Sequence, residues 1–480
     1  MKVLLAVPPA NQSIFADNTL TAVVPPLGLC QVAGCLAAAG HEVILADASA
    51  EKLDEPGFIK RVKVSGAVAL LFTATTPQVN MVGKVAERVK QENPDIRIVL
   101  GGPHASALPR RTLQEFSGLD AVVIGEGDEA ANELLKYFES DKKMKQPPGT
   151  CVRQKGQILI GPDRDWIRDL DALPLPMFDG LPLDSYGRFF IRRKLKKLPV
   201  HTGRGCPFRC AFCYRGMGDK LRTRSVAFVI EEIKRDIKDF GVQQIIFTDE
   251  NFGLPQSRAF ELCENLIHSS CQISWICETH ATSLNAELAK IMKAAGCEQV
   301  HIGVESGDPE ILKTSGKGAT LEKVRGAIDA AKQAGLFIQA NFIIGHPGET
   351  EQSARATIDF ARSLGANRCG FAIMVPFPGT KVYNLAEKGE GGYRLLSENW
   401  DFYGKQFGYA LELVKLPRHR LVQLQLKGYT ATLGRLTELA ANGFFPDIRT
   451  LMTFGLIFVW SLYESIRYKL FGPRKALNEG

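Results

Sequence analysis

Continuous apolar runs alternate with amphipathic stretches over the first 140 or so residues of the chain. Helical patterns separate these runs, and uninterrupted apolar strands are typical of a parallel sheet that helices cover on both faces. The pattern therefore predicts a doubly wound, Rossmann-like α/β domain over residues 1–145. Its expected strands are the runs at residues 3–7, 42–47, 67–74, 96–102 and 121–127.

A second alternation of strand and helix begins near residue 199. It contains six expected strands, which is fewer than the eight that close a full (β/α)8 barrel. We therefore expect a partial, open-sided (β/α)6 barrel over residues 196–385, joined to the first domain by a Pro-, Leu- and Asp-rich linker over residues 146–195. The six expected strands are the runs at residues 199–203, 243–252, 272–280, 297–306, 336–345 and 368–377.

The last part of the chain, residues 386–480, has a helical and basic pattern. It contains an uncharged run from Thr450 to Tyr463, which is shorter than the roughly 20 residues that span a bilayer. Flanking basic residues and Trp460 are compatible with a helix that lies in a membrane interface. A terminal helix packed against the barrel is the other interpretation, so peripheral membrane contact is a hypothesis.

Composition narrows the class of protein. The 480 residues are 45% hydrophobic and 23% charged, with a mild net charge of +7. Basic residues do not form a tract interleaved with aromatic ones, so nucleic acid is not an expected partner. The apolar run at the N-terminus is too short for a signal peptide, and the eleven cysteines are too scattered for a disulfide framework. These features favour a reducing, cytoplasmic setting.

Three cysteines lie in one short loop directly after the first expected barrel strand. Cys206, Cys210 and Cys213 form a CxxxCxxC pattern among several arginines. A structural zinc site needs four protein ligands, and the next cysteine, Cys263, belongs to a helical pattern far along the chain. Three thiolates instead suit a 4Fe–4S cluster that keeps one iron open for a reacting ligand. Three unrelated buried thiols are a poor alternative, because the loop is polar.

This loop resembles that of the radical S-adenosylmethionine (SAM) superfamily. Phe212, just before the last cysteine, is typical of the superfamily, as is a cysteine loop after the first strand of a partial barrel. The resemblance implies that the three cysteines hold a catalytic cluster whose open iron binds the amino and carboxylate groups of SAM. An electron from the cluster then cleaves SAM to a 5′-deoxyadenosyl radical, which removes a hydrogen atom from the substrate.

The later strand ends of the barrel match the superfamily's SAM-binding motifs. By this resemblance the second strand end binds the methionine amino group, the fourth binds the ribose and carboxylate, and the fifth and sixth lie beside the adenine. The alternative for a carboxylate at a strand end is to cap the next helix. The candidate residues are Asp249, Glu250, Glu305, Ser306, Asn341, Gly345 and Pro376.

Glycine-bearing strand ends of the first domain suggest close approach to a large ligand, although each is also compatible with an ordinary βα turn. A GxGxxG motif does not follow the first strand, so a dinucleotide is not expected. The segments "PPLGLCQVAGCLAAAGHEV", "GGPHAS" and "GEGDEA", placed ahead of the barrel, resemble the cobalamin-binding domains of cobalamin-dependent radical SAM enzymes. The resemblance implies that Thr73, Thr75, Gly101, Gly102, Gly125 and Glu126 line the corrin and its nucleotide tail.

The cobalt ligand is a point of departure from that resemblance. The sequence lacks D-x-H-x-x-G, which supplies a histidine to cobalt in other cobalamin domains. His104 in "GGPHAS" is the substitute candidate, although the default for a loop histidine is a hydrogen bond within its own turn. We therefore expect cobalamin without a histidine from that motif below the cobalt.

The two resemblances together imply radical methylation of an unactivated carbon. The substrate radical takes a methyl group from methylcobalamin, and the cobalt is then reduced and remethylated by a second SAM. Other relatives perform oxidative cyclisation or ring rearrangement, including the anaerobic cyclase of chlorophyll biosynthesis. A non-catalytic iron–sulfur or cobalamin carrier is a third interpretation. The expected partners are a small-molecule or lipid-like substrate, such as a tetrapyrrole or terpenoid, and an electron donor such as flavodoxin or ferredoxin.

Overall fold

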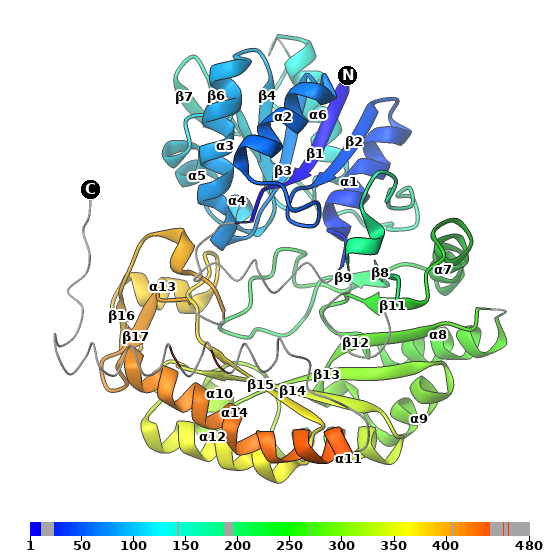
Figure 1. Cartoon of the computed structure of the whole chain (residues 1–480), viewed down its shortest axis with the longest axis vertical. Coiled ribbons are helices and arrows are strands. Elements are labelled where there is room, and N and C mark those ends of the chain that lie inside the picture. Colours follow the sequence, from blue (N-terminus) through cyan, green and yellow to red (C-terminus); the bar gives the residue numbers. More distant parts are fainter. Residues whose placement is uncertain are drawn as a thin grey trace.

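The two predicted α/β units lie one above the other in the computed structural model of the chain (Figure 1). The structure describes residues 1–10, 24–141, 144–186, 195–269, 271–405 and 408–441, together with residues 455 and 459. The run at residues 450–463, and with it the membrane hypothesis, therefore lies outside the described residues apart from those last two positions.

The first unit is a seven-stranded sheet in the order β2-β1-β3-β4-β5-β6-β7. Its first five strands are parallel, and residues such as Val3 and Leu4 on opposite faces of β1 are both completely buried. This is why these strands read as uninterrupted apolar runs. The strands are β1 (Lys2–Val7), β2 (Glu42–Asp47), β3 (Ala69–Thr73), β4 (Arg97–Gly101), β5 (Ala121–Val123), β6 (Thr150–Gln154) and β7 (Gln157–Ile160).

Helices cover both faces of this sheet, which confirms the doubly wound prediction. α1 and α6 pack together on one face, and α2 and α3 pack together on the other. The helices are α1 (Leu27–Ala38), α2 (Glu55–Ser65), α3 (Val79–Glu92), α4 (Pro103–Ala107), α5 (Pro109–Glu115) and α6 (Gly127–Glu139).

The prediction of a linker over the whole of residues 146–195 is wrong at its start. β6 and β7 form a hairpin that extends the first sheet with antiparallel strands. Its two-residue turn, Lys155 and Gly156, has φ angles of 47° and 77°, which is the left-handed geometry of a tight hairpin turn. The irregular segment between the units begins after β7 and contains only a short 3₁₀ turn, η3 (Leu183–Ser185), among its described residues.

The second unit is a six-stranded parallel sheet in the order β15-β14-β13-β12-β11-β8, as expected of a partial barrel. Its strands are β8 (Lys197–Val200), β11 (Gln244–Phe247), β12 (Ser274–His280), β13 (Cys297–Glu305), β14 (Phe337–Ile344) and β15 (Arg368–Ile373). The helices between them lie on the outer side of the sheet (Figure 1). They are α7 (Val226–Phe240), α8 (Gln256–His268), α9 (Ala286–Ala294), α10 (Pro309–Thr314), α11 (Leu321–Gln333) and α12 (Glu351–Leu364).

The region after the barrel is only partly helical, which corrects the expectation for residues 386–480. After α13 (Lys381–Glu387) the chain forms the small antiparallel pair β16 (Tyr393–Leu395) and β17 (Leu411–Leu413), with the 3₁₀ turn η5 (Trp400–Phe402) between them. Glycines with left-handed backbone at positions 389, 391 and 392 follow α13 and prevent its continuation as a helix. α14 (Arg418–Ala441) then packs on β15. No helix in the described ranges is long and apolar enough to cross a membrane.

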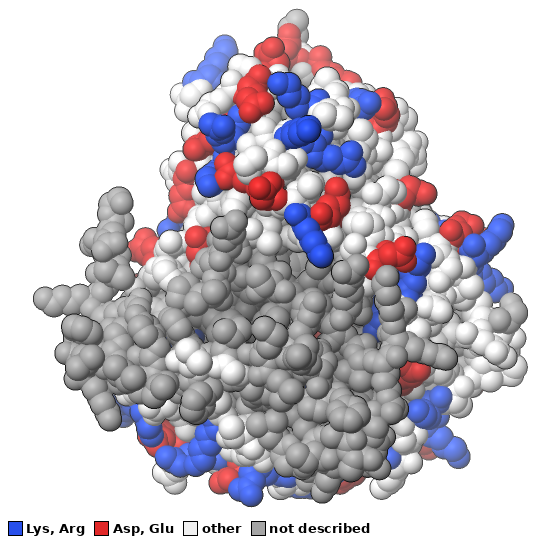
Figure 2. Space-filling view, in the orientation of Figure 1, with Lys and Arg blue, Asp and Glu red and all other residues white. Residues whose placement is uncertain are grey.

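Figure 2 shows the surface charge on the face that Figure 1 presents. Lys and Arg side chains alternate with Asp and Glu side chains over the visible part of the first unit. Basic and acidic side chains are therefore interspersed on this part of the surface.

Candidate active site

The cysteine loop connects two very short strands, β9 (Gly203–Arg204) and β10 (Arg222–Thr223), that follow β8. Cys206 N–H donates to the Gly218 carbonyl at 3.3 Å, and Cys213 N–H donates to the Cys210 carbonyl at 3.2 Å. Gly205 has a φ of 93° and lies against the Lys220 backbone. Only glycine fits where the chain enters the loop, because the two strands of backbone approach each other so closely there.

The three thiols lie near one another and near the ion pair of Glu305 and Lys317. The Cys210 and Cys213 thiols are hydrogen-bonded to each other, and this bond lowers the pKa of Cys210 and raises that of Cys213. Burial raises the pKa of Cys206. The nearby Lys317 ammonium favours the thiolates, but at Cys210 and Cys213 the Glu305 carboxylate opposes it. In the part of the chain that the structure describes, no three His, Cys, Asp or Glu side chains converge as ligands of one metal ion.

Backbone hydrogen bonds fix the cysteine loop to the carboxyl ends of the barrel strands. Ala211 N–H donates to the Ser315 carbonyl at 2.8 Å, and Val382 N–H donates to the Ala211 carbonyl at 3.0 Å. Phe208 stacks on the His280 ring at a centroid distance of 3.9 Å. The loop is therefore held from two sides, by the segment between α10 and α11 and by the start of α13.

The two predicted carboxylates after β11 occupy different environments. Asp249 is buried and accepts hydrogen bonds from Thr202 N–H at 2.7 Å, Gly203 N–H at 2.8 Å and the Thr202 hydroxyl at 2.9 Å. Burial raises the pKa of Asp249 to about 6. Glu250 is exposed and close enough to Cys206 to raise the pKa of that thiol. Asp249 therefore supports the entry to the cysteine loop, whereas Glu250 lies beside its first cysteine.

The two predicted residues after β13 also differ. Glu305 has a left-handed φ of 69°, and its carboxylate accepts a hydrogen bond of 2.7 Å from Lys317. Gly303 makes room for this pair, since a Cβ atom there would collide with both side chains. Such strain in a non-glycine residue is typical of functional sites. Ser306, in contrast, is completely buried, and its hydroxyl bonds to Thr357 of α12 at 3.0 Å.

The fifth strand end lies beside the aromatic residue of the cysteine loop. Gly345 has a φ of 102°, and its carbonyl accepts a hydrogen bond from the Tyr393 hydroxyl at 2.9 Å. The fully buried His346 lies edge-on to Phe212 at 5.8 Å. Pro376 is buried, whereas Asn341 is part-exposed on β14.

Tyr214, next to Cys213, connects the cysteine loop to the first unit. Its hydroxyl is hydrogen-bonded to Ser106 of α4, and the Ser106 hydroxyl accepts a 3.0 Å bond from Gly125 N–H at the end of β5. The Tyr214 ring also packs against Gly379, where a Cβ atom would collide with it. Sequence reasoning missed Tyr214, because nothing local marks an aromatic residue at this position as a bridge.

Buried ion pairs hold the two units together at the same place. Arg204 donates two hydrogen bonds of 2.9 Å to Asp128, and a third of 2.9 Å to Glu126. Glu126 also binds Arg222 at 2.9 Å, and it accepts a bond from Ile167 N–H at 3.0 Å. All four charged side chains are at least 89% buried. The predicted ligand Glu126 is therefore fully engaged in the contact between the units.

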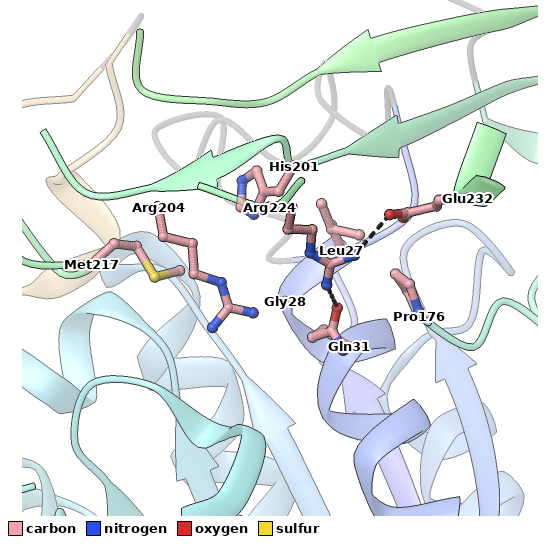
Figure 3. Close-up of a pocket in the computed structure, with 9 residues that line it drawn as sticks. All are labelled: Leu27, Gly28, Gln31, Pro176, His201, Arg204, Met217, Arg224 and Glu232. Carbon is pink, nitrogen blue, oxygen red and sulfur yellow. Dashed lines mark hydrogen bonds and ion pairs between the residues drawn. The ribbon is translucent and has the colours of Figure 1, made fainter. Parts of the chain in front are cut away.

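A small pocket lies beside these ion pairs, between the start of α1 and strands β8 and β9 (Figure 3). Arg224 spans it, donating to Glu232 and to Gln31 at 2.8 Å each. His201 and Arg204 line the opposite side. The pocket is thus a charged part of the contact between the units.

The remaining predicted residues lie at the strand ends of the first unit. Gly102 has a φ of 98° and is close to the Ala74 carbonyl, whereas a Cβ atom at Gly101 would meet only one backbone atom at 3.8 Å. Thr75 is exposed and caps the turn η2 (Thr76–Gln78). Thr73 is part-exposed beside Gly102.

Comparison with known proteins identifies the family. The model of the radical SAM superfamily matches residues 200–361, and that of the B12 binding domain matches residues 15–135. An uncharacterised methyltransferase from Pyrococcus horikoshii is 34% identical over 408 residues, covering 84% of this chain and 86% of that protein. The chain belongs to the cobalamin-dependent radical SAM family.

More distant relatives in this family have assigned reactions. The anaerobic magnesium-protoporphyrin IX monomethyl ester cyclase of Rubrivivax gelatinosus is 28% identical, covering 76% of this chain and 67% of that protein. Among solved structures, the radical SAM methyltransferase TsrM from Kitasatospora setae, with cobalamin and a 4Fe–4S cluster bound, matches with a TM-score of 0.73 at 18% identity. That match covers 97% of this chain and 100% of the TsrM chain, and it shows a shared fold.

Membership identifies the chain as a radical SAM enzyme with a 4Fe–4S cluster, SAM and cobalamin as its cofactors. The cysteine loop fits the cluster, because it brings three thiols together, which is the ligand set of a 4Fe–4S cluster that keeps one iron open. The strand ends of the first unit fit a large cofactor less evenly. Gly101 is part-exposed with open space beside it, whereas Gly125 lies against the Trp166 ring and Glu126 is buried in ion pairs.

His104 does not fit the role of a cobalt ligand. It is 1% exposed, and its ring packs edge-on against Trp400 of η5 at 4.7 Å. Nδ1 lies 3.4 Å from the Thr76 hydroxyl, so the partner is on a neighbouring strand end and not in its own turn. Nε2 lacks a hydrogen-bond partner among the described residues, and burial lowers the pKa of His104 to about 3. The imidazole is enclosed by the C-terminal region.

Proposed function

We propose that this enzyme transfers a methyl group to an unactivated carbon of a small biosynthetic substrate. The contact from Cys213 through Tyr214 and Ser106 to Gly125 carries the proposal. It joins the proposed cluster loop to a proposed cobalamin-binding strand end through two hydrogen bonds. A reaction that needs both cofactors at one substrate requires such proximity.

Residues of the chain have separate roles in this proposal. When bound, SAM and the cluster supply the radical that removes a hydrogen atom, and cobalamin supplies the methyl group. Cys206, Cys210 and Cys213 hold the cluster, and the exposed carboxylate of Glu250 is placed beside Cys206 to bind the cationic end of SAM. The strained Glu305, paired with Lys317, presents a second polar group on the neighbouring strand end.

Arg204 lies two residues before Cys206, and its ion pairs are buried from water. In this proposal these pairs keep the two units in contact beside the cysteine loop. A closed contact there limits the access of solvent to a radical.

Oxidative cyclisation is the second candidate, because the magnesium-protoporphyrin cyclase of Rubrivivax gelatinosus is 28% identical to this chain. SAM with a deuterated methyl group separates the two reactions. In a reduced, reconstituted enzyme, methyl transfer yields a substrate product that carries the labelled methyl group. A product without the label favours cyclisation, and a failure to form 5′-deoxyadenosine contradicts both reactions.

We also propose that a cytoplasmic flavodoxin or ferredoxin reduces the cluster. All eleven cysteines are free thiols, which suits a reducing compartment. Reduced flavodoxin should support 5′-deoxyadenosine formation in place of a chemical reductant. An enzyme that responds to dithionite but to neither protein would require a different donor.

A further inference from the structure

The third strand end of the barrel received no role from the sequence, yet it places a buried histidine beside the cysteine loop. His280 is the last residue of β12, lies opposite Gly303 in the strand register and is only 6% exposed. Its backbone N–H donates at 3.0 Å to the side chain of Asn251, which directly follows Asp249 and Glu250. The backbone of His280 is therefore fixed to the second strand end, which carries two of the predicted SAM-binding carboxylates.

Hydrogen bonds determine which ring nitrogen of His280 carries the proton. Nδ1 accepts from the Thr282 N–H at 3.2 Å and lies 2.7 Å from the Thr282 hydroxyl. Nε2 lies 2.8 Å from the backbone carbonyl of Lys317, and a carbonyl can only accept. The ring is therefore the neutral tautomer in which Nε2–H donates to Lys317 and Nδ1 accepts from the turn η4 (Ala281–Ser283).

The same imidazole ring also holds the cysteine loop. Its face stacks on Phe208, which lies between Cys206 and Cys210, with 3.9 Å between the ring centroids and an interplanar angle of 14°. The Phe208 ring is also next to Gly318, the residue after Lys317. Stacked aromatic rings attract each other in a preferred geometry. One imidazole therefore fixes the cysteine loop with its face and the segment between α10 and α11 with its edge.

Lys317 is the residue through which this contact reaches the thiols. Its ammonium group donates a 2.7 Å hydrogen bond to the Glu305 carboxylate, and both charges act on the Cys210 and Cys213 thiols. The left-handed backbone of Glu305, with a φ of 69°, persists only where its surroundings hold it. A shift of the Lys317 backbone would therefore displace the cation and its carboxylate together.

We propose that His280 is a positioning residue for SAM: its Nε2–H keeps Lys317, and with it Glu305, in place beside the cysteine loop before SAM arrives. A ligand binds more tightly to polar groups that are already ordered, because their ordering does not have to accompany binding. This inference rests on the proposed role of Glu305. It does not depend on whether methylation or cyclisation follows SAM cleavage.

The first test measures positioning in the absence of SAM. His280→Phe keeps an aromatic ring against Phe208 but removes the donor to Lys317, whereas the amide N–H of His280→Gln can restore that donor. Hydrogen exchange of the full-length enzyme, with cluster and cobalamin, is followed by mass spectrometry over residues 313–320. We expect exchange at least fivefold faster in His280→Phe and within twofold of wild type in His280→Gln. His268→Phe, the same change at an exposed histidine on the outer helix α8, is the matched control and should exchange like the wild type.

The second test measures SAM affinity by equilibrium dialysis. His280→Phe should keep the iron content of the wild type and bind SAM at least fivefold more weakly, because the three cysteines remain while Lys317 is displaced. The EPR spectrum of its reduced cluster should change correspondingly less when SAM is added. His280→Gln should bind SAM within twofold of wild type. Glu305→Gln should weaken SAM binding at least fivefold.

Three results would overturn the inference. They are exchange or SAM affinity unchanged in His280→Phe, a loss of iron in that variant, and a loss of SAM affinity in His280→Gln as large as in His280→Phe, which would indicate a purely structural histidine. Wild-type SAM affinity in Glu305→Gln, combined with fast exchange and weak SAM binding in His280→Phe, contradicts the proposed role of Glu305 and leaves the positioning of Lys317 by His280 supported.

Discussion

The predicted carboxylates have different surroundings at the strand ends of the barrel and at the strand ends of the first unit. In the barrel, Glu250 lies beside Cys206, and Glu305 is kept close to the thiols by Lys317. In the first unit, Glu126 is buried in ion pairs with Arg204 and Arg222. Glu305 is itself paired with the buried Lys317, so of these three carboxylates Glu250 is the one whose side chain is left exposed for a ligand.

The same distinction applies within the barrel. Asp249 and Glu250 are adjacent, yet one accepts three hydrogen bonds from the segment before the cysteine loop and the other is exposed. Glu250 also accepts a backbone hydrogen bond from Gly205, so this strand end carries one enclosed carboxylate and one that is exposed beside Cys206. This comparison is tested by variants that remove either a residue expected to contact a cofactor or a residue expected to support the fold.

Removal of the three cysteines should have the largest effect. The triple variant with Cys206, Cys210 and Cys213 replaced by alanine should lose iron binding and SAM cleavage completely, because no thiolate remains to hold the cluster. Cobalamin should remain bound, since the first unit keeps its own core. Iron content, 5′-deoxyadenosine yield and the visible spectrum of cobalamin measure these outcomes.

The matched control for this variant is Cys263→Ala. Cys263 is a completely buried thiol on α8, so its loss should cost only about 1 kcal/mol of stability and leave iron binding intact. SAM cleavage that survives in the triple variant would contradict the cluster assignment.

The buried ion pairs between the units should give the next largest effect. Arg204→Met leaves Asp128 without the guanidinium that it contacts, and Glu126 with one arginine fewer. Removing one partner of a buried pair costs about 3–5 kcal/mol. Urea unfolding of the full chain should show a loss of this size.

Arg355→Met is the control, because Arg355 binds Glu351 within helix α12 and the two side chains are 46% and 37% exposed. Exposed pairs contribute about 0–1 kcal/mol. Equal losses in the two variants would show that the position of the pairs between the units has no special importance.

Local sequence patterns were sufficient to predict the parallel strands of both sheets and the cysteine loop. The strands are apolar runs, and the three cysteines lie within eight residues of one another. Contacts made over long sequence distances were not predictable. Arg204 is 78 residues from Glu126, and nothing near either residue specifies the other. The β6–β7 hairpin was missed because its turn, Lys155-Gly156, lacks the Asn-Gly or Asp-Gly pair that marks such turns.

The charged pocket of Figure 3 predicts a smaller, pH-dependent effect. Burial raises the pKa of Glu232 to about 7 despite its bond to Arg224. The folded protein therefore keeps a proton that the unfolded chain releases near pH 4.5. The stabilising contribution is present below that pH and is lost as the pH rises through about 7.

Between pH 5 and pH 8 the free energy of unfolding of the wild type should fall by about 1–3 kcal/mol more than that of Glu232→Gln. Urea unfolding of both proteins at pH 5 and at pH 8 gives the loss of unfolding free energy in each, and the two losses are compared. A wild type and variant with the same pH dependence would mean that Glu232 is charged in the folded protein throughout this range.

The smallest effect should come from Thr75, which tests whether a strand-end residue of the first unit supports the fold or contacts the cofactor. Its hydroxyl caps η2 together with Gln78. Thr75→Val removes this cap at a cost of about 1 kcal/mol, which should appear as a small decrease in thermal stability with cobalamin affinity unchanged.

Gly101→Val is the paired change, because Gly101 leaves backbone open at the end of β4. If the isopropyl group of Gly101→Val lowers cobalamin affinity while Thr75→Val does not, then Gly101 contacts the cofactor and Thr75 supports the fold. The reverse result would place Thr75 in contact with the cofactor.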